Sequence, residues 1–232
     1  MSKPIGIVAC SAEGAALCYR TICIEGAQGL GQAHAHPEVS LHTHSLADYV
    51  ARIERDDWPA VADLMLSSAH RLARAGAAFL VCPDNTTHQA MPWVEPASPL
   101  PWLHIADVVA AEAQRRGLRR LGLTGTRWLV DSEVYPRSLA AHDLDWRRPP
   151  VEQRVEVGRI IMDELVAGVR EPASVAYLLR VIEGLRDAGC DAVVLGCTEL
   201  PLVVDDGNAC LPTLDSTRLL ARAALRRSIA GA

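Results

Sequence analysis

The hydrophobic pattern of the chain alternates between short apolar runs and longer segments with apolar residues at helical spacing. The short runs are bounded by glycine or polar residues, which is typical of buried parallel strands: 5–9, 77–82, 120–124 and 192–197. A more polar run with alternating pattern, 38–44, predicts an edge strand. The longer segments predict helices from about residue 15 and over 58–75, 106–116, 129–141, 151–168, 174–188 and from 216 onward, with a Gly- and His-rich loop over 26–37. Strands alternating with amphipathic helices predict an α/β protein whose sheets are mostly parallel.

Two parts of the chain resemble one another. Residues 74–86 align without gaps on residues 187–199, and in this alignment Asp84 lies opposite Cys197, each at the end of a predicted strand. Residues 211–215 likewise echo residues 100–104. The repeat predicts two similar halves, which we place at 1–98 with 210–232 and at 99–209. In this division the last strand and helix return to the first half, and the proline-rich stretch 92–101 crosses between the halves.

The composition excludes several classes of enzyme. Lys3 is the only lysine of the 232 residues, whereas a pyridoxal phosphate enzyme needs an internal Schiff-base lysine and a P-loop needs Gly-Lys-Ser/Thr. No Gly-x-Gly-x-x-Gly follows a predicted strand, so a nicotinamide or flavin site has no support. We therefore expect no cofactor.

Charge and cysteine content narrow the partners and the compartment. The net charge of −5 argues against a nucleic-acid partner, and we expect no membrane partner because no apolar run approaches the length of a membrane helix. The start of the chain lacks a signal-peptide pattern, and seven cysteines, an odd number, indicate reduced thiols and a cytoplasmic protein. No Cys-x-x-Cys pair is present, and we interpret His34, His36, His42 and His44 as solvent-facing, so we expect no metal.

Two motifs carry a resemblance to a known family. Asp84-Asn85-Thr86-Thr87-His88 resembles Cys-Asn-Thr-x-His, and Gly196-Cys197-Thr198-Glu199 matches Gly-Cys-Thr-Glu, both of the aspartate/glutamate racemase superfamily. Residues 121–126 and 214–217 are also similar to family segments. The resemblance implies two pseudo-symmetric α/β halves with the active site in the cleft between them. It also implies a cofactor-independent racemase or epimerase, a homodimer, and a small amino acid or related carboxylate as substrate.

The chain departs from the family pattern at three places. Asp84 stands where family racemases usually have their first catalytic cysteine, and Ala9-Cys10-Ser11-Ala12 stands where a Gly-Gly-Met loop is common. The segments that hold a cationic pair in aspartate-specific members, 44–47 and 165–168, contain no Arg or Lys. We therefore expect a substrate other than aspartate.

The chemistry of racemisation assigns roles to the residues of both motifs. A thiolate is a suitable base for an α-proton, so we assign Cys197 as base and Asp84, which must be protonated for the task, as the acid on the opposite face. Backbone N–H groups after the strands, together with polar side chains, form a cradle for the substrate carboxylate. We assign substrate binding to Ser11, Asn85, Thr86, Thr126, Thr198 and Glu199.

Other interpretations of these residues stay open. Relatives on the same scaffold include decarboxylases, cis-trans isomerases and lyases, and these reactions are compatible with Cys197 as a single acid/base. A non-catalytic ligand-binding protein is a further alternative. Asp84-Asn85 is also compatible with a simple helix cap, Cys82 with a buried structural thiol, and His88 with a side chain that ties its loop down.

Overall fold

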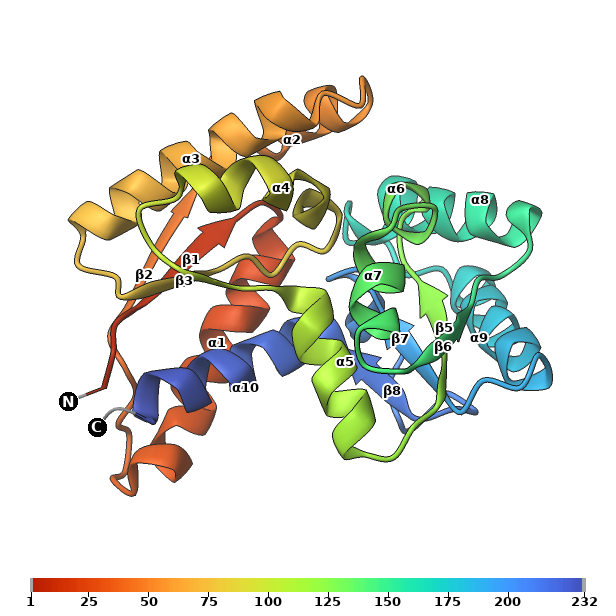
Figure 1. Ribbon diagram of the computed structural model, residues 1–232. Coiled ribbons are helices and arrows are strands. Elements are labelled where there is room, and N and C mark those ends of the chain that lie inside the picture. The colour runs from red at the N-terminus through yellow and green to blue at the C-terminus, as the bar shows by residue number, and fades with distance from the viewer. Residues whose placement is uncertain (1, 231–232) are drawn as a thin grey trace. The chain divides into compact units, whose positions relative to one another are not determined.

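The computed structural model describes residues 2–230, which form two compact α/β units. The described residues up to Val108 and from Thr217 onward make up the first unit, and Val109–Ser216 make up the second. The chain passes between the units within helix α5 and returns at the start of helix α10 (Figure 1). The proline-rich stretch 92–101 lies within the first unit, and the unit boundaries fall after Val108 and after Ser216.

The first unit contains one parallel sheet of four strands in the order β2-β1-β3-β4. Helix α3 packs against one face of this sheet, and α1 and α10 cover the other (Figure 1). The elements are β1 Ile5–Ala9, α1 Ala12–Leu30, β2 Val39–Thr43, α2 Leu46–Ile53, α3 Trp58–Arg74, β3 Phe79–Val81, α4 Met91–Val94, β4 Trp102–Leu103, α5 Ile105–Arg115 and α10 Ser216–Ile229.

The second unit repeats this sheet with the order β6-β5-β7-β8, again all parallel. Helices α8 and α9 bury their apolar faces against β7, and a short π-helical turn over Ile160–Leu165 continues α8. The elements are β5 Arg120–Thr124, α6 Arg127–Val130, α7 Val134–Ala140, β6 Asp145–Arg147, α8 Val151–Arg159, α9 Pro172–Asp187, β7 Ala192–Leu195 and β8 Thr213–Asp215. The predicted α/β class with two similar halves is confirmed.

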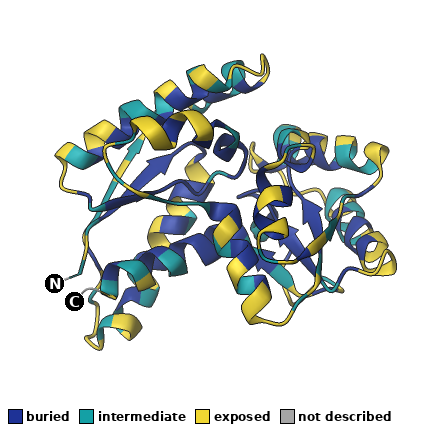
Figure 2. Cartoon of the chain, in the orientation of Figure 1, coloured by how far each residue is buried: buried dark blue, intermediate teal, exposed yellow. Residues whose placement is uncertain are grey.

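Burial follows the position of each strand in its sheet. The central strands β1, β3 and β7 are buried along their whole length, whereas the edge strands β2 and β6 are partly exposed (Figure 2). A strand covered by helices on both faces must be apolar throughout, which is why β1 and β7 are continuous apolar runs in the sequence.

Strand pairing confirms the internal repeat. Val81 of β3 lies beside Leu103 of β4, and Val194 of β7 lies beside Leu214 of β8. The gapless alignment that placed Asp84 opposite Cys197 also places Val81 opposite Val194. β3 and β7 are therefore equivalent strands, each third in its sheet.

The structure corrects several expected boundaries. Helix α1 begins at Ala12 and continues to Leu30, so it takes up the first residues of the segment 26–37 that was expected to be a loop, while residues 31–37 form no helix or strand. Gly26 fits inside it because a Cβ there would lie 2.7 Å from the Cβ of His36, so glycine lets the following segment pack closely. The expected helix over 129–141 is two helices, α6 and α7.

The last strand also differs from its expected place. β8 pairs with β7 and completes the second sheet, so only α10 returns to the first unit. Leu220 and Ala221 of α10 share a core with Ile7 of β1. Backbone hydrogen bonding fixes the strand beside its sheet neighbour, while the apolar face of the helix is free to pack elsewhere.

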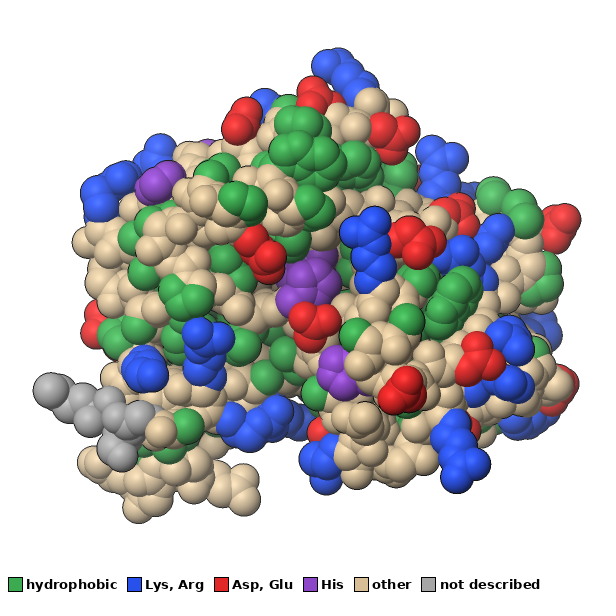
Figure 3. Space-filling model, in the orientation of Figure 1, with side chains coloured by type: hydrophobic (Ala, Val, Ile, Leu, Met, Phe, Trp, Pro, Cys, Tyr) green, Lys and Arg blue, Asp and Glu red, His purple; other side chains and the backbone are tan. Residues whose placement is uncertain are grey.

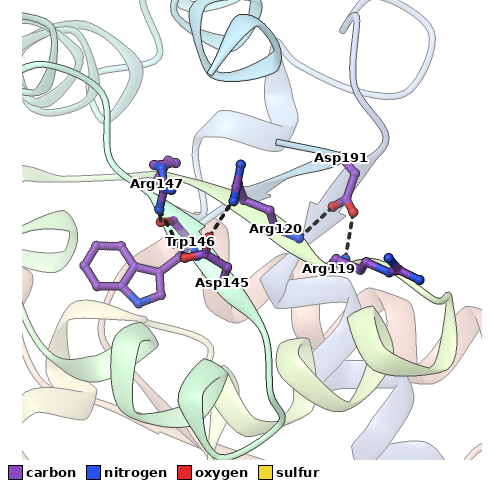
Figure 4. A network of polar contacts seen from close by, with 6 residues as sticks. All are labelled: Arg119, Arg120, Asp145, Trp146, Arg147 and Asp191. Atoms are coloured by element: carbon purple, nitrogen blue, oxygen red, sulfur yellow. Dashed lines mark hydrogen bonds and ion pairs between the residues drawn. The ribbon is translucent and has the colours of Figure 1, made fainter. Parts of the chain in front are cut away.

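Strand β6 was not predicted from the sequence because it is short and polar. Asp145 accepts from Arg120 Nε at 2.8 Å and from Arg147 Nη1 at 3.1 Å, and Asp191 accepts from the backbone N–H groups of Arg119 and Arg120 (Figure 4). Asp145 and Arg147 place charges on β6, an edge strand, which is a recognised protection against edge-to-edge pairing. Asp191, just before β7, joins the starts of the interior strands β5 and β7. On the face of the second unit drawn in Figure 3, Arg and Asp/Glu side chains are interspersed.

Candidate active site

The candidate site residues lie just beyond the carboxyl ends of equivalent strands. Parallel α/β sheets bind ligands at this edge, because loops and helix N-termini converge there. Asp84 follows β3 in the first unit, and Cys197 follows β7 in the second.

The loop after β3 turns at once into a 3-10 helix over Thr86–Ala90. Asp84 is half-buried, and its Oδ1 accepts from Thr87 N at 3.2 Å. This bond joins residues i and i+3, as a capping bond does, although the residue at the N-cap position of the 3-10 helix is Asn85, whose side chain makes no capping bond. Asn85 and Thr86, both assigned to substrate binding, are buried in the same loop.

Cys82 and Thr87 form a second set of contacts in this loop. Cys82 Sγ lies 3.3 Å from Thr87 Oγ1, which donates to the carbonyl oxygen of Asp84 at 3.1 Å. Burial, and secondarily the charge of Asp84, raises the pKa of the Cys82 thiol to about 12. Cys82 is therefore a protonated hydrogen-bond donor, not a thiolate nucleophile.

His88 closes the loop from the other side. Its Nε2 lies 3.0 Å from the carbonyl oxygen of Cys82, and because a carbonyl only accepts, Nε2 carries the hydrogen. The ring packs edge-on against His104, with 4.5 Å between centroids. Burial and His104 lower the pKa of His88 well below its usual value, so the ring is neutral. The expectation that His88 ties its loop down is confirmed by this bond.

Ser11 lies at the carboxyl end of β1 in the first unit. Its Oγ accepts from Gly14 N at 3.2 Å, and the residue is the N-cap of α1. The hydroxyl that we assigned to substrate binding therefore also caps a helix. Because Ser11 is the cap, α1 begins at Ala12 and not at about residue 15 as expected.

In the second unit Gly196 allows the loop after β7 to approach β5. Its N–H donates to Thr124 O at 2.9 Å, and a Cβ at this position would lie 2.6 Å from the same oxygen. Glycine is therefore required for β7 to stay beside β5 at the residue preceding Cys197.

Cys197 points its thiol at a carboxylate. Its Sγ lies 2.9 Å from Glu199 Oε2, and Thr198 Oγ1 donates to the same oxygen at 2.7 Å. All three residues are buried. The structure thus brings together Cys197, Thr198 and Glu199, and it places Glu199 as the acceptor of the thiol.

The direction of this hydrogen bond shows which atom carries the proton. Cys197 Sγ donates to Glu199 Oε2, so the thiol carries the hydrogen and the carboxylate accepts it. The arrangement gives the thiol an acceptor for the proton that a thiolate base must lose.

Thr126 follows β5 and caps the short helix α6. Its Oγ1 accepts from Leu129 N at 3.3 Å, and the side chain is buried. Like Ser11 and Asp84, Thr126 combines its expected place at a strand end with a capping bond.

Similarity to known proteins assigns the chain to a family. The family model described as Asp/Glu/hydantoin racemase matches residues 15–224. The chain belongs to this family. Racemases are isomerases, and the predicted enzyme class is confirmed.

Individual relatives extend the comparison. The chain is 22% identical to the broad specificity amino-acid racemase RacX of Bacillus subtilis over 72% of this chain and 71% of that protein. It is 34% identical to a glutamate racemase of Thermus thermophilus over 67% of this chain, which spans 57% of that enzyme.

Solved structures resemble the whole chain. A candidate Asp/Glu racemase from Yersinia pestis superposes with a TM-score of 0.89 at 30% identity, covering 98% of this chain and 99% of that one. An aspartate racemase homologue from Pyrococcus horikoshii gives a TM-score of 0.82 at 26% identity with the same coverage.

The histidines around β2 differ from their expected exposure. His34 and His36 are exposed, but His42 and His44 are half-buried, and His42 Nδ1 lies 2.9 Å from the buried Ser68 Oγ. Burial, then His44 and Arg71, lowers the pKa of His42. Within residues 2–230, no cluster of three or more His, Cys, Asp or Glu side chains has an arrangement that could hold a metal.

Segments 44–47 and 165–168 contain no Arg or Lys, and the cation of Arg52, in the helix that begins within the first segment, already has partners on its own helix. Arg52 on α2 donates to Asp48 O at 2.6 Å and lies 3.9 Å from the Asp48 carboxylate. His44 Nε2, by contrast, is buried and forms no hydrogen bond among the described residues.

In the described part of the chain, no helix is both long and apolar enough to cross a membrane.

Thr87 and His104 were missed as functional candidates. Thr87 occupies the variable position of the Asp-Asn-Thr-x-His motif. His104 lies in the segment 100–104, which is similar to 211–215 but belongs to neither motif, so neither residue could be singled out from the sequence. Only the observed bond from Thr87 to Asp84 and the ring contact with His88 identify them.

Proposed function

We propose that this protein is a cofactor-independent amino-acid racemase or epimerase in which Cys197 removes the α-proton. The observation that carries the proposal is the bond of 2.9 Å between Cys197 Sγ and Glu199 Oε2, within an intact Gly-Cys-Thr-Glu on the family fold. A thiol held against a carboxylate has an acceptor for its own proton, which a base must lose before it acts.

The role of Glu199 extends its sequence-based assignment. Its carboxylate receives two donors, the thiol of Cys197 and the hydroxyl of Thr198, so its position is fixed before substrate arrives. When the substrate ammonium group approaches, its positive charge favours the thiolate over the thiol. Glu199 then accepts the proton of the Cys197 thiol, and the Cys197 thiolate removes the α-proton of the substrate.

Asp84 is proposed as the second acid/base group. Racemisation requires a proton donor on the face of the α-carbon opposite to the base, and Asp84 occupies the strand position equivalent to that of Cys197. The residue is half-buried, unlike its neighbours Asn85 and Thr86, which are buried. Ser11, Asn85, Thr86, Thr126 and Thr198 are proposed to bind the substrate carboxylate.

One observation favours a second candidate function. Asp84 Oδ1 already accepts from Thr87 N, as a helix-capping aspartate does. If capping is its whole role, Cys197 is the single acid/base group, and a decarboxylase, cis-trans isomerase or lyase reaction fits better than racemisation.

The substrate is proposed to be an amino acid without a second side-chain carboxylate. Arg52 is bound to its own helix, and the segment 165–168 contains no cation. The relatives named above act on a broad range of amino acids or on glutamate, so a panel is needed to find the substrate. We further propose a cytoplasmic homodimer, a location consistent with seven cysteines that all lie in the described residues and form no disulfide there.

The test is an amino-acid panel in deuterated water, followed by mass spectrometry and chiral chromatography. A racemase incorporates deuterium at the α-carbon and converts one enantiomer of the substrate into the other, whereas a decarboxylase releases carbon dioxide. The matched control is Cys197→Ser, which keeps the size of the side chain but supplies a hydroxyl too weakly acidic to act as base. Turnover that survives in Cys197→Ser contradicts the role of Cys197.

A further inference from the structure

The backbone of Asp84 is fixed by a chain of buried polar groups. The Thr87 hydroxyl lies 3.1 Å from the carbonyl oxygen of Asp84, and the Cys82 thiol lies 3.9 Å from the same oxygen. Cys82 Sγ and Thr87 Oγ1 lie 3.3 Å apart, and either group can be the donor of that contact. Whichever of the two donates to the other, the Asp84 carbonyl oxygen accepts a hydrogen bond from this pair.

Thr87 therefore holds Asp84 at two points. Its backbone N–H binds the side-chain oxygen Oδ1, and its hydroxyl binds the main-chain oxygen. A capping aspartate needs only the first bond. The second bond fixes the peptide plane from which the carboxyl group projects, and together the two bonds restrict the direction in which Oδ2 points.

We propose that Cys82 and Thr87 are positioning residues for Asp84, whose carboxyl group they aim for its role in proton transfer. This inference rests on the proposed function of Asp84. Cys82 and Thr87 are each at most 1% exposed, so neither group meets solvent, and both are committed to the loop. His88 holds the start of the same loop through its bond to Cys82 O.

A buried thiol and hydroxyl explain why this loop differs from a simple cap. Each buried polar group needs a hydrogen-bond partner, and here each satisfies the next. A proton-transfer group must stay within a few tenths of an ångström of its working position, and a displacement of 1 Å can lower the rate about a hundredfold. A loop fixed through its backbone meets this requirement better than one fixed by a single side-chain bond.

The test compares Thr87→Val with Thr87→Ser. Valine keeps the shape and the backbone N–H but removes the hydroxyl, whereas serine keeps the hydroxyl. We expect Thr87→Val to lower kcat by about tenfold or more with KM changed by less than about twofold, and Thr87→Ser to retain most of kcat. The matched control is Thr21→Val, which removes a buried hydroxyl that donates to Leu17 O at 2.7 Å in α1 of the same unit.

Hydrogen–deuterium exchange of the backbone provides a readout independent of activity. In Thr87→Val we expect faster exchange over residues 83–90 and unchanged exchange over β1. Unchanged kcat overturns the proposal, and so does lower kcat without faster exchange in the loop, or exchange that rises equally in β1. If the parent protein exchanges the α-proton of no amino acid, the proposed function fails, while the exchange comparison still decides whether Thr87 fixes the loop.

Discussion

The substitution Asp84→Asn separates the two roles that the structure gives to Asp84. The asparagine side-chain oxygen can still accept from Thr87 N, which Asp84 Oδ1 does at 3.2 Å. Asn and Asp are about equally good caps, so the free energy of unfolding changes little. Asparagine cannot release a proton, however, so the variant removes the acid and keeps the cap.

The expected magnitudes for stability and catalysis are well separated. A positioned acid or base contributes about 10²–10⁴ to a rate, which equals about 3–5 kcal/mol of barrier. Asp84→Ala loses the cap as well, at about 1 kcal/mol, or about 2–4 °C in Tm for a chain of this size. We therefore expect both variants to lose racemisation and only Asp84→Ala to lose stability.

The two directions of the reaction respond differently. A thiolate is more basic than a carboxylate by about 4 pKa units, or about 6 kcal/mol, so abstraction from the Cys197 side is the faster. In Asp84→Asn, the enantiomer that presents its α-hydrogen to Cys197 still exchanges it for deuterium, while inversion stops. Asp84→Cys restores two thiols and should make the two directions more alike.

The assay is deuterium incorporation, with each enantiomer supplied separately and the product resolved by chiral chromatography. Thermal unfolding of both variants provides the control for stability. If Asp84→Asn racemises both enantiomers at the parent rate, Asp84 is only a helix cap and the two-base mechanism is wrong. A Tm for Asp84→Asn as low as that of Asp84→Ala would refute the claim that asparagine preserves the cap.

Two further results are expected. Racemisation of D-aspartate should be weak or absent because Arg52 is bound to α2; efficient turnover of both aspartate enantiomers would show that another group, such as His44, binds the second carboxylate. Stability should fall as the pH decreases from 6.5 toward 5, because burial lowers the pKa of His88 in the folded state and the unfolded chain binds the proton first. Burial also lowers the pKa of the neighbouring His104, although the charges of Asp107 and Glu95 act in the opposite direction. Urea unfolding of His88→Gln at several pH values therefore separates the contribution of His88 from that of His104. An unchanged pH dependence in His88→Gln would contradict this assignment.

The sequence by itself determined the class of fold and the equivalence of its two halves. β1 and β5 begin and end at the predicted residues. For β1 the reason is that a strand buried on both faces must be a continuous apolar run. The motif around Cys197 was identified from sequence because residues 187–199 repeat residues 74–86 and because Gly196-Cys197-Thr198-Glu199 matches a family motif.

Tertiary structure decided the features that depend on partners distant in sequence or on polar geometry. β6 is too polar to be predicted as a strand, and it forms because Arg120 and β5 lie beside it. β8 joins the second sheet because it hydrogen-bonds to β7, a choice that its own residues do not encode.

The site shows the same division. Sequence identified Asp84 and Cys197 as equivalent residues, but hydrogen-bond directions gave them different surroundings: Asp84 accepts from Thr87, and Cys197 donates to Glu199. A motif specifies which chemical groups are present. Hydrogen bonds depend on tenths of an ångström, and only the packed backbone sets those distances.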